Sequence, residues 1–514
     1  MVNLPADFVA ETRRIMGDER YNRFVGAFDE EAPTSIRVNP RIAIDHGPLT
    51  MDHSDSQVPW CSEGYYLQDR PQFTFDPLLH AGCYYVQEAS SMFVTHILRN
   101  VQCSSTSEAA KPITMVRSSS AGLQGKNGQC SMVRSSSAGL QGKNGQCSMV
   151  NGQCSMVNGQ CSMVNVQCSM VNGQCSMFRS SSAGLQGKNG QCSMFNGQCS
   201  MVNVQCALDL CAAPGGKSTA LRSVLPDDCV LISNEPMGNR AQILLENVTK
   251  WGGPNHIVTN NYPRDFRKAK LKFDLILCDV PCSGEGMFRK DPNAISEWSA
   301  QNVEKCWQLQ REIVADAWEC LNPGGLLIYS TCTYNTKENE ENIRWILDTY
   351  DAQVLDIPVD PSWNITGSLL QGFNEPVYRF IPGITRGEGL FVCALRKRGN
   401  SGSTKNCKLS IVRSSSAGLQ GKNSQLKVLS AELEHSDVYV DVDYATALKY
   451  LRGEALVLPA DTPRGIVTIT YQGQPLGPAK NIGNRANNLY PKAWRIKSTH
   501  LPSEAPKVLK NVKI

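Results

Sequence analysis

The segment of residues 209–219, D-L-C-A-A-P-G-G-K-S-T, constrains the fold of this chain more than any other. It follows the apolar residues Ala207 and Leu208 and precedes the helix-compatible run 220–222. This order predicts a strand, a tight glycine turn and the start of a helix. Because such a turn lets a ligand approach bare backbone, the segment predicts a binding loop at the end of a strand.

Two kinds of nucleotide site compete for this loop. Residues 216–218 match the end of a phosphate-binding loop, but that motif also needs a glycine where this chain has Cys211. The second kind is an adenine nucleoside site, with an acidic residue about 20 positions further on for the ribose hydroxyls. Glu235, after the apolar stretch 229–233, has that position, so the second interpretation is favoured. A turn that needs glycine only for its geometry stays an alternative for the glycines alone.

The composition is that of a soluble globular protein. The 514 residues, 41% of them hydrophobic and 19% charged, are enough for two or three domains. No run of 18 apolar residues occurs, and residues 1–16 carry four charges and no apolar core, so neither export nor membrane insertion is predicted. Nine of the 21 cysteines lie in one repetitive tract, and the other 12 suit a reducing cytosol. We therefore expect a cytoplasmic protein.

The net charge of +4 is unevenly distributed along the chain. Residues 446–514 carry 11 Lys and Arg against 3 Asp and Glu, and residues 116–206 carry 6 basic residues and no acidic ones. The remainder is therefore acidic, at −10. A basic tail beside an acidic body suggests phosphate contact at the tail, with a solvated charged face as the alternative.

Residues 1–115 predict a separate α+β domain. Two helices are expected within residues 4–28, and residues 35–39 are expected to form a strand with Arg37 exposed. Residues 84–86 lead into a helix that runs to Leu98. Between them, residues 87–91 (Q-E-A-S-S) either line a pocket or cap the helix.

Residues 116–206 are repetitive. A 17-residue unit begins at positions 116, 133 and 178, alternates with the seven-residue unit N-G-Q-C-S-M-V, and recurs in part at 412–423. Each unit has too few large apolar residues to build a stacked core, so disorder is predicted rather than a solenoid. Cysteines spaced by seven without histidines match no common zinc pattern, and no metal is expected. Residues 399–428 are predicted to be a linker that contains the partial copy.

After the glycine turn, strands and helices alternate over residues 207–398. This pattern predicts a doubly wound parallel sheet with helices on both faces. Helices are expected at 238–251, 303–321 and 337–349, and strands at 256–259, 273–279 and 325–331. One strand ends at Asp279 and is followed by Cys282, and another delivers Cys332. Because ligands bind outside the carboxyl ends of such strands, both cysteines, Asp279 and Glu235 are expected to face one crevice.

These motifs resemble those of the Nol/Nop/Sun RNA (cytosine-5)-methyltransferases, which use S-adenosylmethionine. The resemblance rests on D-L-C-A-A-P-G-G-K, D-V-P-C-S-G-E-G and S-T-C-T-Y-N-T-K-E-N-E, and it covers about residues 207–397. The tail, at 450–454 and 476–497, resembles the bacterial 16S ribosomal RNA branch of the family. The front part, including residues 87–91, is similar to the family's RNA-binding leader. A Rossmann-like catalytic domain is therefore expected between two RNA-binding parts.

The resemblance implies methylation of C5 of a cytidine in RNA. C5 is a poor nucleophile, and a thiolate that adds at C6 pushes electron density onto it. Cys332 matches the family's nucleophile, Cys282 then removes the C5 proton and expels Cys332, and Asp279 is expected to donate a proton to the edge of the base. DNA cytosine methyltransferases carry the nucleophile on a Pro-Cys pair, which points to Cys282; Cys332 is favoured because the match around it is to the RNA family.

S-adenosylmethionine is the cofactor that the resemblance implies. The residues expected to bind it are Cys211, Ala212, Ala213, Pro214, Gly215, Gly216, Lys217, Glu235, Asn261 and Asp279. Asn261 stands where the family usually has an aspartate near the adenine, which removes a charge from that contact. Arg289 and Lys290 are candidates for contact with RNA phosphate, with solvation as the alternative.

Residues 429–514 predict a small β-rich domain that resembles the PUA-like RNA-binding appendage. Its interleaved basic and aromatic residues suit stacking and phosphate contact: Lys480, Arg485, Tyr490, Lys492, Trp494 and Arg495. Packing against the catalytic domain is the alternative for Trp494.

We therefore expect a monomeric enzyme that acts on 16S rRNA or the small ribosomal subunit and binds neither DNA nor membrane. A tRNA cytosine-5 methyltransferase and a non-catalytic RNA-binding ribosome assembly factor are the alternatives.

Overall fold

The computed structural model describes residues 2–42, 57–101, 204–399, 426–431 and 436–509 in full. It also describes the backbone of strands within residues 112–199 and 419–425. The chain forms two compact units, one of Leu98–Asn203 and one of Met1–Ile97 with Val204–Ile514. None of the helices in the described part is both long and apolar enough to cross a membrane.

A nine-stranded sheet organises the larger unit. Its order is β16-β18-β15-β14-β11-β12-β13-β21, with β17 paired to β18. The parallel strands are β11 (Cys206–Asp209), β12 (Val230–Asn234), β13 (His256–Thr259), β14 (Phe273–Asp279) and β15 (Leu321–Thr331). The antiparallel ones are β16 (Ala352–Val354), β17 (Tyr378–Phe380), β18 (Leu390–Lys397) and β21 (Val428–Leu429). The predicted doubly wound α/β fold is confirmed.

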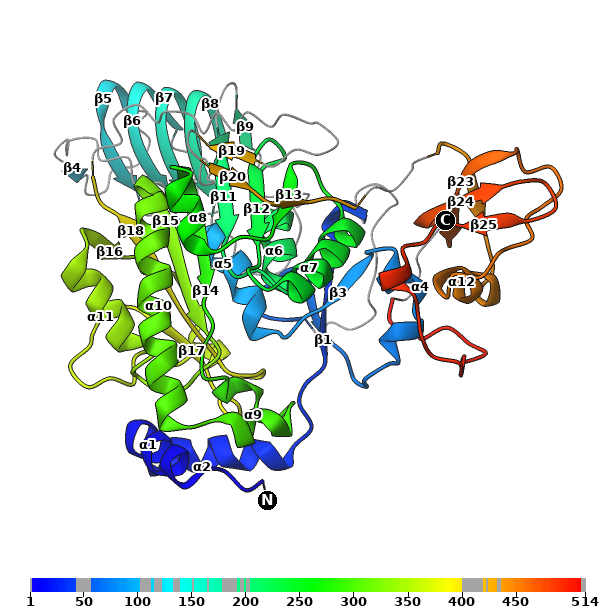
Figure 1. Ribbon diagram of the computed structural model, residues 1–514. Helices are drawn as coiled ribbons and strands as arrows, with labels where there is room; N and C mark the ends of the chain where they lie inside the picture. Colours follow the sequence, from blue (N-terminus) through cyan, green and yellow to red (C-terminus); the bar gives the residue numbers. More distant parts are fainter. Residues whose placement is uncertain are drawn as a thin grey trace. The chain divides into compact units, whose positions relative to one another are not determined.

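Helices cover both faces of this sheet. On one face α6 (Gly216–Val224) contacts α7 (Gly238–Trp251), and on the other α10 (Ala300–Cys320) contacts α8 (Pro263–Lys268) and α11 (Glu340–Thr349). Figure 1 shows α10 running alongside β14 and β15. The strand order reverses at β11, which pairs with both β12 and β14. Ligands of such sheets bind at this reversal, outside the carboxyl ends of the strands.

Two of the predicted helices begin at other residues than expected. Helix α10 begins at Ala300, because the Ser299 hydroxyl accepts from the Asn302 N–H and caps the helix. Helix α11 begins at Glu340 rather than at 337. The three preceding residues form a turn in which Glu338 and Asn339 are wholly buried and bonded to the neighbouring loops.

The front part and the tail share one hydrophobic core. The front sheet has the antiparallel order β2 (Gly64–Tyr66), β1 (Ser35–Val38), β3 (Tyr84–Val86), and it is followed by α5 (Phe93–Asn100). The tail has a four-stranded sheet, β22 (Tyr439–Asp441), β23 (Gly465–Tyr471), β24 (Gln474–Asn481) and β25 (Ala486–Asn488), with α12 (Tyr444–Leu451). Leu78 and Tyr84 of the front part belong to the same buried cluster as Leu448, Tyr450 and Tyr490 of the tail. The tail is therefore packed against the front part.

The first two helices pack against the catalytic domain. Helix α1 (Ala6–Met16) places the ring of Phe8 with its centroid 5.0 Å from that of Phe288, and α2 (Asp18–Gly26) places Phe24 4.8 Å from Tyr334. Phe288 and Tyr334 follow the two cysteine-bearing segments in sequence. One segment of the front part thus packs against the tail, and its first two helices pack against the loops that carry the cysteines.

The smaller unit contains parallel strands that pair identical repeats. Strands β5 (Leu123–Met132), β6 (Gly139–Met149), β7 (Gly152–Met163) and β8 (Val166–Met177) are adjacent, and their register sets like residues side by side, such as Cys130 and Cys147. For these stretches the structure differs from the predicted disorder. The prediction assumed that ordered repeats need a large apolar core. Strands that pair repeats in register satisfy the hydrogen bonds of their backbone groups without such a core. The other residues of the tract lie outside the described part.

Candidate active site

The glycine loop follows β11 and leads into α6, as predicted. Gly215 has a φ of 114°, in the left-handed region, and a Cβ there would lie 3.3 Å from a Leu244 methyl group. Only glycine suits this position. A cavity of about 170 Å³ lies against the loop. It is lined by Tyr85, Val86, Gln87, Glu88, Ser91, Asp209, Cys211, Ala212, Ala213, Pro214, Gly216, Lys217 and Asp279.

Asp209 is a candidate site residue that our sequence analysis did not single out, and it lines the cavity. Its side chain is wholly buried at the end of β11, and the Ser218 hydroxyl donates to Oδ2 at 2.5 Å. Its Oδ1 has no hydrogen-bond partner in the described part of the chain. Burial raises the pKa of Asp209 to about 7, although the bond from Ser218 opposes this. A buried acceptor without a partner beside a cavity is a candidate contact for a donor group of a ligand.

The front part of the chain supports the glycine loop through Arg37. The strand β1 is found as predicted, but Arg37 is wholly buried, and its expected exposure is wrong. Its guanidinium donates to Thr219 Oγ1 at 2.6 Å and to Gln87 Oε1 at 2.8 Å, and it lies 4.3 Å from the Trp251 ring centroid. Strand alternation alone cannot show this, because Thr219 lies 182 positions from Arg37 in the sequence, and Gln87 lies 50 positions from it.

Residues 87–91 fulfil both of the roles left open by the sequence. Gln87, Glu88 and Ser91 line the cavity. The Glu88 carboxylate also accepts from the backbone N–H groups of Ser90 at 2.9 Å and Ser91 at 3.0 Å, in the turn that leads into α5. Tyr85, on the preceding strand, donates from its hydroxyl to the Pro214 carbonyl at 3.2 Å.

Glu235 and Asn261 lie outside the lining of this cavity. Glu235 is buried, and its carboxylate accepts from the Met237 N–H at 2.9 Å. The Asn261 amide donates to the Lys427 carbonyl at 3.0 Å and accepts from the Lys427 N–H at 2.9 Å. Asn261 thus holds Lys427 beside the end of β13. Strand β21 begins at the next residue and pairs with β13, although Lys427 lies in the segment predicted to be a linker.

Asp279 is ion-paired at the end of β14. Lys217 Nζ lies 2.9 Å from Oδ2, and the Ser330 hydroxyl donates to Oδ1 at 2.6 Å. Burial lowers the pKa of Lys217, but the charge of Asp279 and the hydrogen bond to it outweigh this, so the pKa is raised. These contacts describe a carboxylate that accepts with both oxygens, whereas the sequence analysis expects a proton donor.

The two candidate cysteines meet. Cys282 and Cys332 follow the adjacent strands β14 and β15, and their sulfur atoms lie 3.2 Å apart. The hydrogen bond to Cys332, followed by burial, raises the pKa of Cys282 well above its ordinary value. The raised pKa favours the thiol form of Cys282, and either sulfur can be the donor in the contact between them.

Two glutamates hold the cysteine loops together, and we call them the reciprocal carboxylate pair. Glu285, three residues after Cys282, accepts from the N–H groups of Tyr334 at 2.6 Å and Asn335 at 3.0 Å. Glu338, six residues after Cys332, accepts from the Ser283 N–H at 3.0 Å. Each loop thus supplies the acceptor for the backbone of the other.

The surroundings of this pair are buried and close-packed. Glu285 and Glu338 are at most 1% exposed, and the Gln310 amide donates to Glu338 at 2.6 Å. The Gly286 N–H donates to the Cys332 carbonyl at 2.6 Å, and a Cβ at Gly286 would lie 2.4 Å from that oxygen. Our sequence analysis did not single out either glutamate, although both stand inside the motifs S-G-E-G and T-K-E-N-E. The sequence feature that could have revealed them is an acidic residue in the turn that follows each cysteine.

Comparison with known proteins identifies the family. Three family models match successive parts of the chain: the N-terminal domain of 16S rRNA methyltransferase RsmF over residues 4–89, 16S rRNA methyltransferase RsmB/F over 199–396, and the methyltransferase RsmF PUA domain over 438–496. Ribosomal RNA small subunit methyltransferase F of Escherichia coli O17:K52:H18 is 30% identical over 352 residues, which cover 55% of this chain and 72% of the relative. The chain belongs to the RsmB/F family. It is an RNA methyltransferase whose methyl donor is S-adenosylmethionine.

Other relatives agree with this RsmB/F assignment. The protein of the same name from Serratia proteamaculans is 28% identical over 348 residues, covering 55% of this chain and 72% of the relative. The crystal structure of PH0851, 20% identical, matches with a TM-score of 0.50 over 77% of this chain and 66% of that one, and it shows the same fold.

The cavity of this RsmB/F enzyme fits the cofactor. S-adenosylmethionine has a positively charged sulfur and an amino group, and the buried Asp209 carboxylate has an oxygen without a partner in the described part. Gly216 lines the cavity without a side chain, and a Cβ there would fill the gap toward the Tyr85 ring, 3.4 Å away. The donor set therefore suits a small cationic nucleoside derivative.

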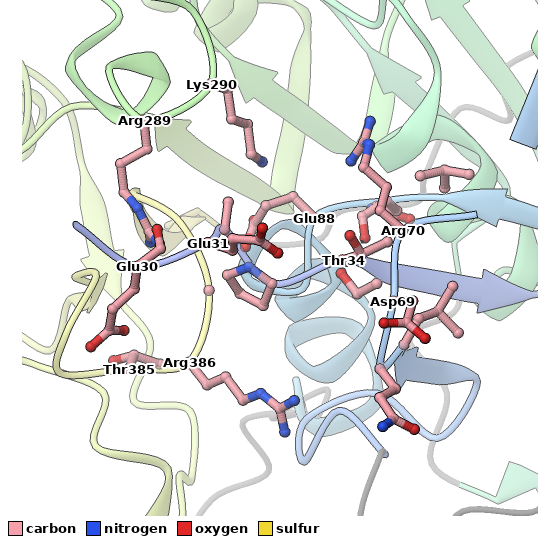
Figure 2. A pocket seen from close by; sticks show the side chains of 18 of the residues that line it. Glu30, Glu31, Thr34, Asp69, Arg70, Glu88, Arg289, Lys290, Thr385 and Arg386 are labelled. Carbon is pink, nitrogen blue, oxygen red and sulfur yellow. Dashed lines mark hydrogen bonds between the residues drawn. The ribbon is translucent and has the colours of Figure 1, made fainter. Parts of the chain in front are cut away.

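The two cations after the Cys282 loop differ. The Arg289 side chain is 6% exposed, pairs with Glu388 at 3.3 Å and donates to the Glu30 carbonyl at 3.1 Å. It is therefore held inside the protein rather than offered to RNA. Lys290 is exposed and borders a large cleft (Figure 2).

The tail of this RsmB/F enzyme uses its aromatic residues for packing. Tyr490 is buried, and Trp494 lies with its ring 5.6 Å from Lys250 Nζ of α7. The alternative given for Trp494, packing against the catalytic domain, agrees with this contact. Lys480, Arg485 and Lys492 are exposed and stay candidates for RNA contact.

Proposed function

We propose that this enzyme methylates C5 of a cytidine in the 16S rRNA of the small ribosomal subunit, through a bond between Cys332 Sγ and C6 of the base. The observation that carries the proposal is the 3.2 Å separation of the two sulfurs, next to the Lys217–Asp279 ion pair. A thiolate that adds at C6 moves an electron pair toward C5, which makes that carbon a nucleophile. The target base has to leave its stack to reach the thiol.

Lys217 and Asp279 act on the base. The Asp279 carboxylate accepts a hydrogen bond from the amino group of cytosine, which orients the ring. The ammonium group of Lys217 stabilises the negative charge that develops on the ring when the thiolate adds. Both groups are already paired in the protein, so little reorganisation is needed during the reaction.

Cys282 serves as the base of the second half of the reaction. The hydrogen bond to Cys332 is the first cause of its raised pKa, and the charge of Cys332 contributes as well. Both disappear when Cys332 bonds to C6. Cys282 can then release its proton to solvent and take the proton from C5. The electrons of the broken C5–H bond form the C5=C6 double bond, and the C6–S bond breaks so that Cys332 leaves as a thiolate.

The donor side is formed by residues 211–217 and Asp209, with Glu235 as the candidate for the ribose. When bound, S-adenosylmethionine supplies the methyl group that C5 accepts. We also propose that the enzyme is cytoplasmic, because its mechanism needs both cysteines as free thiols and a reducing compartment keeps them so. We propose further that it acts as a monomer.

The test is transfer of labelled methyl from S-adenosylmethionine to 16S rRNA and to 30S subunits, with Cys332→Ala and Cys282→Ala beside the wild type. We expect label on C5 of cytidine with the wild type and none with Cys332→Ala, while Cys332→Ala binds S-adenosylmethionine within a few-fold of the wild type. Cys282→Ala is expected to leave an RNA adduct that survives denaturing electrophoresis.

Turnover by Cys332→Ala would refute the assignment of the nucleophile. An adduct in Cys332→Ala rather than in Cys282→Ala would reverse the two roles. Label on tRNA but on neither ribosomal substrate would show that tRNA, and not 16S rRNA, is the substrate.

A further inference from the structure

A cleft of about 1030 Å³ lies beside the donor cavity and shares Val86, Gln87 and Glu88 with it. Residues 30–35 and 67–70 of the front part line it on one side, and residues 289–290 and 383–387 of the catalytic domain on the other. Figure 2 shows these segments around Glu88. Whatever occupies the cleft is therefore next to the donor cavity.

Four cations line the cleft, and one of them, Arg289, is paired with Glu388. The other three come from three segments: Arg70, Lys290 and Arg386 (Figure 2). All three are exposed. Within the part of the chain that the structure describes, none of their charged groups forms an ion pair. Arg386 is held in place nonetheless, because its guanidinium lies 4.0 Å from the Tyr66 ring centroid and the Tyr66 hydroxyl donates to its carbonyl at 2.7 Å.

The carboxylates of the cleft are of two kinds. Glu88 is saturated, because its oxygens accept from the N–H groups of Ser90, Ser91 and Glu388. Glu30, Glu31 and Asp69 are exposed among the cations. A track for phosphates alone would not carry exposed carboxylates, since they repel phosphate. Amino groups of bases, in contrast, are donors that carboxylates accept.

Resting on the proposed function, we propose that this cleft holds the nucleotides next to the target cytidine as an unstacked single strand. Arg70, Lys290 and Arg386 contact its phosphates, and the exposed carboxylates face base edges. Single-stranded RNA is recognised in this way, by cations along the backbone combined with contacts to bases that have left their stack.

The chain offers matched control residues for a test. Arg264 lies 5.1 Å from the Tyr262 ring centroid as Arg386 lies over Tyr66, and Arg344 lies 5.7 Å from Phe373 as Arg70 lies 6.0 Å from Phe73. Lys268 is exposed like Lys290. None of these controls lines the cleft. The cleft variant is R70Q/K290Q/R386Q, and the control variant is R264Q/K268Q/R344Q.

The experiment measures binding of a 12-nucleotide oligocytidylate between 50 and 400 mM salt. Each phosphate contact on a single strand contributes about 0.7 to the slope of log K against log salt. The cleft variant is expected to lose about 2 from that slope and to raise KM for 16S rRNA at least about tenfold. The control variant is expected to keep the wild-type slope. Melting temperature and binding of S-adenosylmethionine check that both variants fold.

A cleft variant with the wild-type slope, or an equal loss of slope in both variants, would overturn the proposal. Binding is read without methyl transfer, so the two proposals fail separately. If the wild type transfers no methyl to 16S rRNA, the proposed function fails, and the binding comparison still decides the cleft. If methyl is transferred and the cleft variant keeps both slope and KM, only the cleft proposal fails.

Discussion

The donor loop and the two cysteine loops are held in opposite ways. The donor loop, residues 209–217, is supported from outside, by Arg37 against α6 and by Tyr85 against Pro214. The cysteine loops, residues 280–286 and 331–338, support one another through Glu285 and Glu338. A change at the first support should act on the affinity for the cofactor, and a change at the second should act on the chemical step.

Glu338→Gln should have the largest effect. The amide NH2 group of glutamine cannot accept from Ser283 and Gln310, so a buried donor loses its partner at a cost of about 1–3 kcal/mol, and the Cys282 loop moves. We expect the rate of methyl transfer in a single turnover to fall about 100-fold. S-adenosylmethionine should bind within a few-fold of the wild type. Glu341→Gln, on the next turn, is the control, and equal rates for the two variants would contradict a positioning role.

Arg37→Gln should have the opposite effect to Glu338→Gln, because it should weaken binding of the cofactor more than it slows methyl transfer. The shorter neutral side chain cannot reach Thr219, and the acceptors around Arg37 lose their donor. We expect the Kd for S-adenosylmethionine to rise about tenfold or more and stability to fall by about 2–4 kcal/mol. Calorimetric titration and thermal unfolding measure the two effects. Arg41→Gln removes a partly exposed pair with Asp227 and should cost less than about 1 kcal/mol.

Tyr85→Phe tests the same support more gently. It removes the hydroxyl that donates to the Pro214 carbonyl and accepts from the Asn247 amide at 3.3 Å, and it keeps the ring against the loop. Loss of one hydrogen bond is worth about 0.5–1.5 kcal/mol, so the Kd for S-adenosylmethionine should rise about two- to tenfold. An unchanged Kd would assign the support to Arg37 alone.

The pH dependence of stability gives the smallest expected effect. Burial, followed by the charge of Glu285, raises the pKa of Glu338 from 4.5 to about 7. Because the folded state binds this proton more tightly than the unfolded state, the stabilisation is complete below pH 4.5 and is lost as pH rises through 7. The free energy of unfolding of the wild type, relative to Glu338→Gln, should fall by about 1 kcal/mol between pH 6 and pH 8. Denaturant titrations at both pH values measure it, and a difference that rises with pH would contradict this.

The sequence by itself determined the parallel strands of the catalytic sheet, the glycine loop and the placement of Cys282 and Cys332 at one edge of that sheet. These features depend on local patterns: apolar runs predict the strands, glycine predicts the turn, and residues that follow parallel strands lie at the same edge of the sheet. Strand β14 and helix α7 were predicted residue for residue.

Only the tertiary structure decided which polar side chains support the site. Arg37 is buried because α6 and Trp251 cover it, and Glu285 and Glu338 act across about 50 residues of chain. Asn261 bonds to a segment 166 positions away. A buried polar group takes whichever partner the folded chain places beside it, and residues so distant in sequence leave no local periodicity that would reveal the pairing.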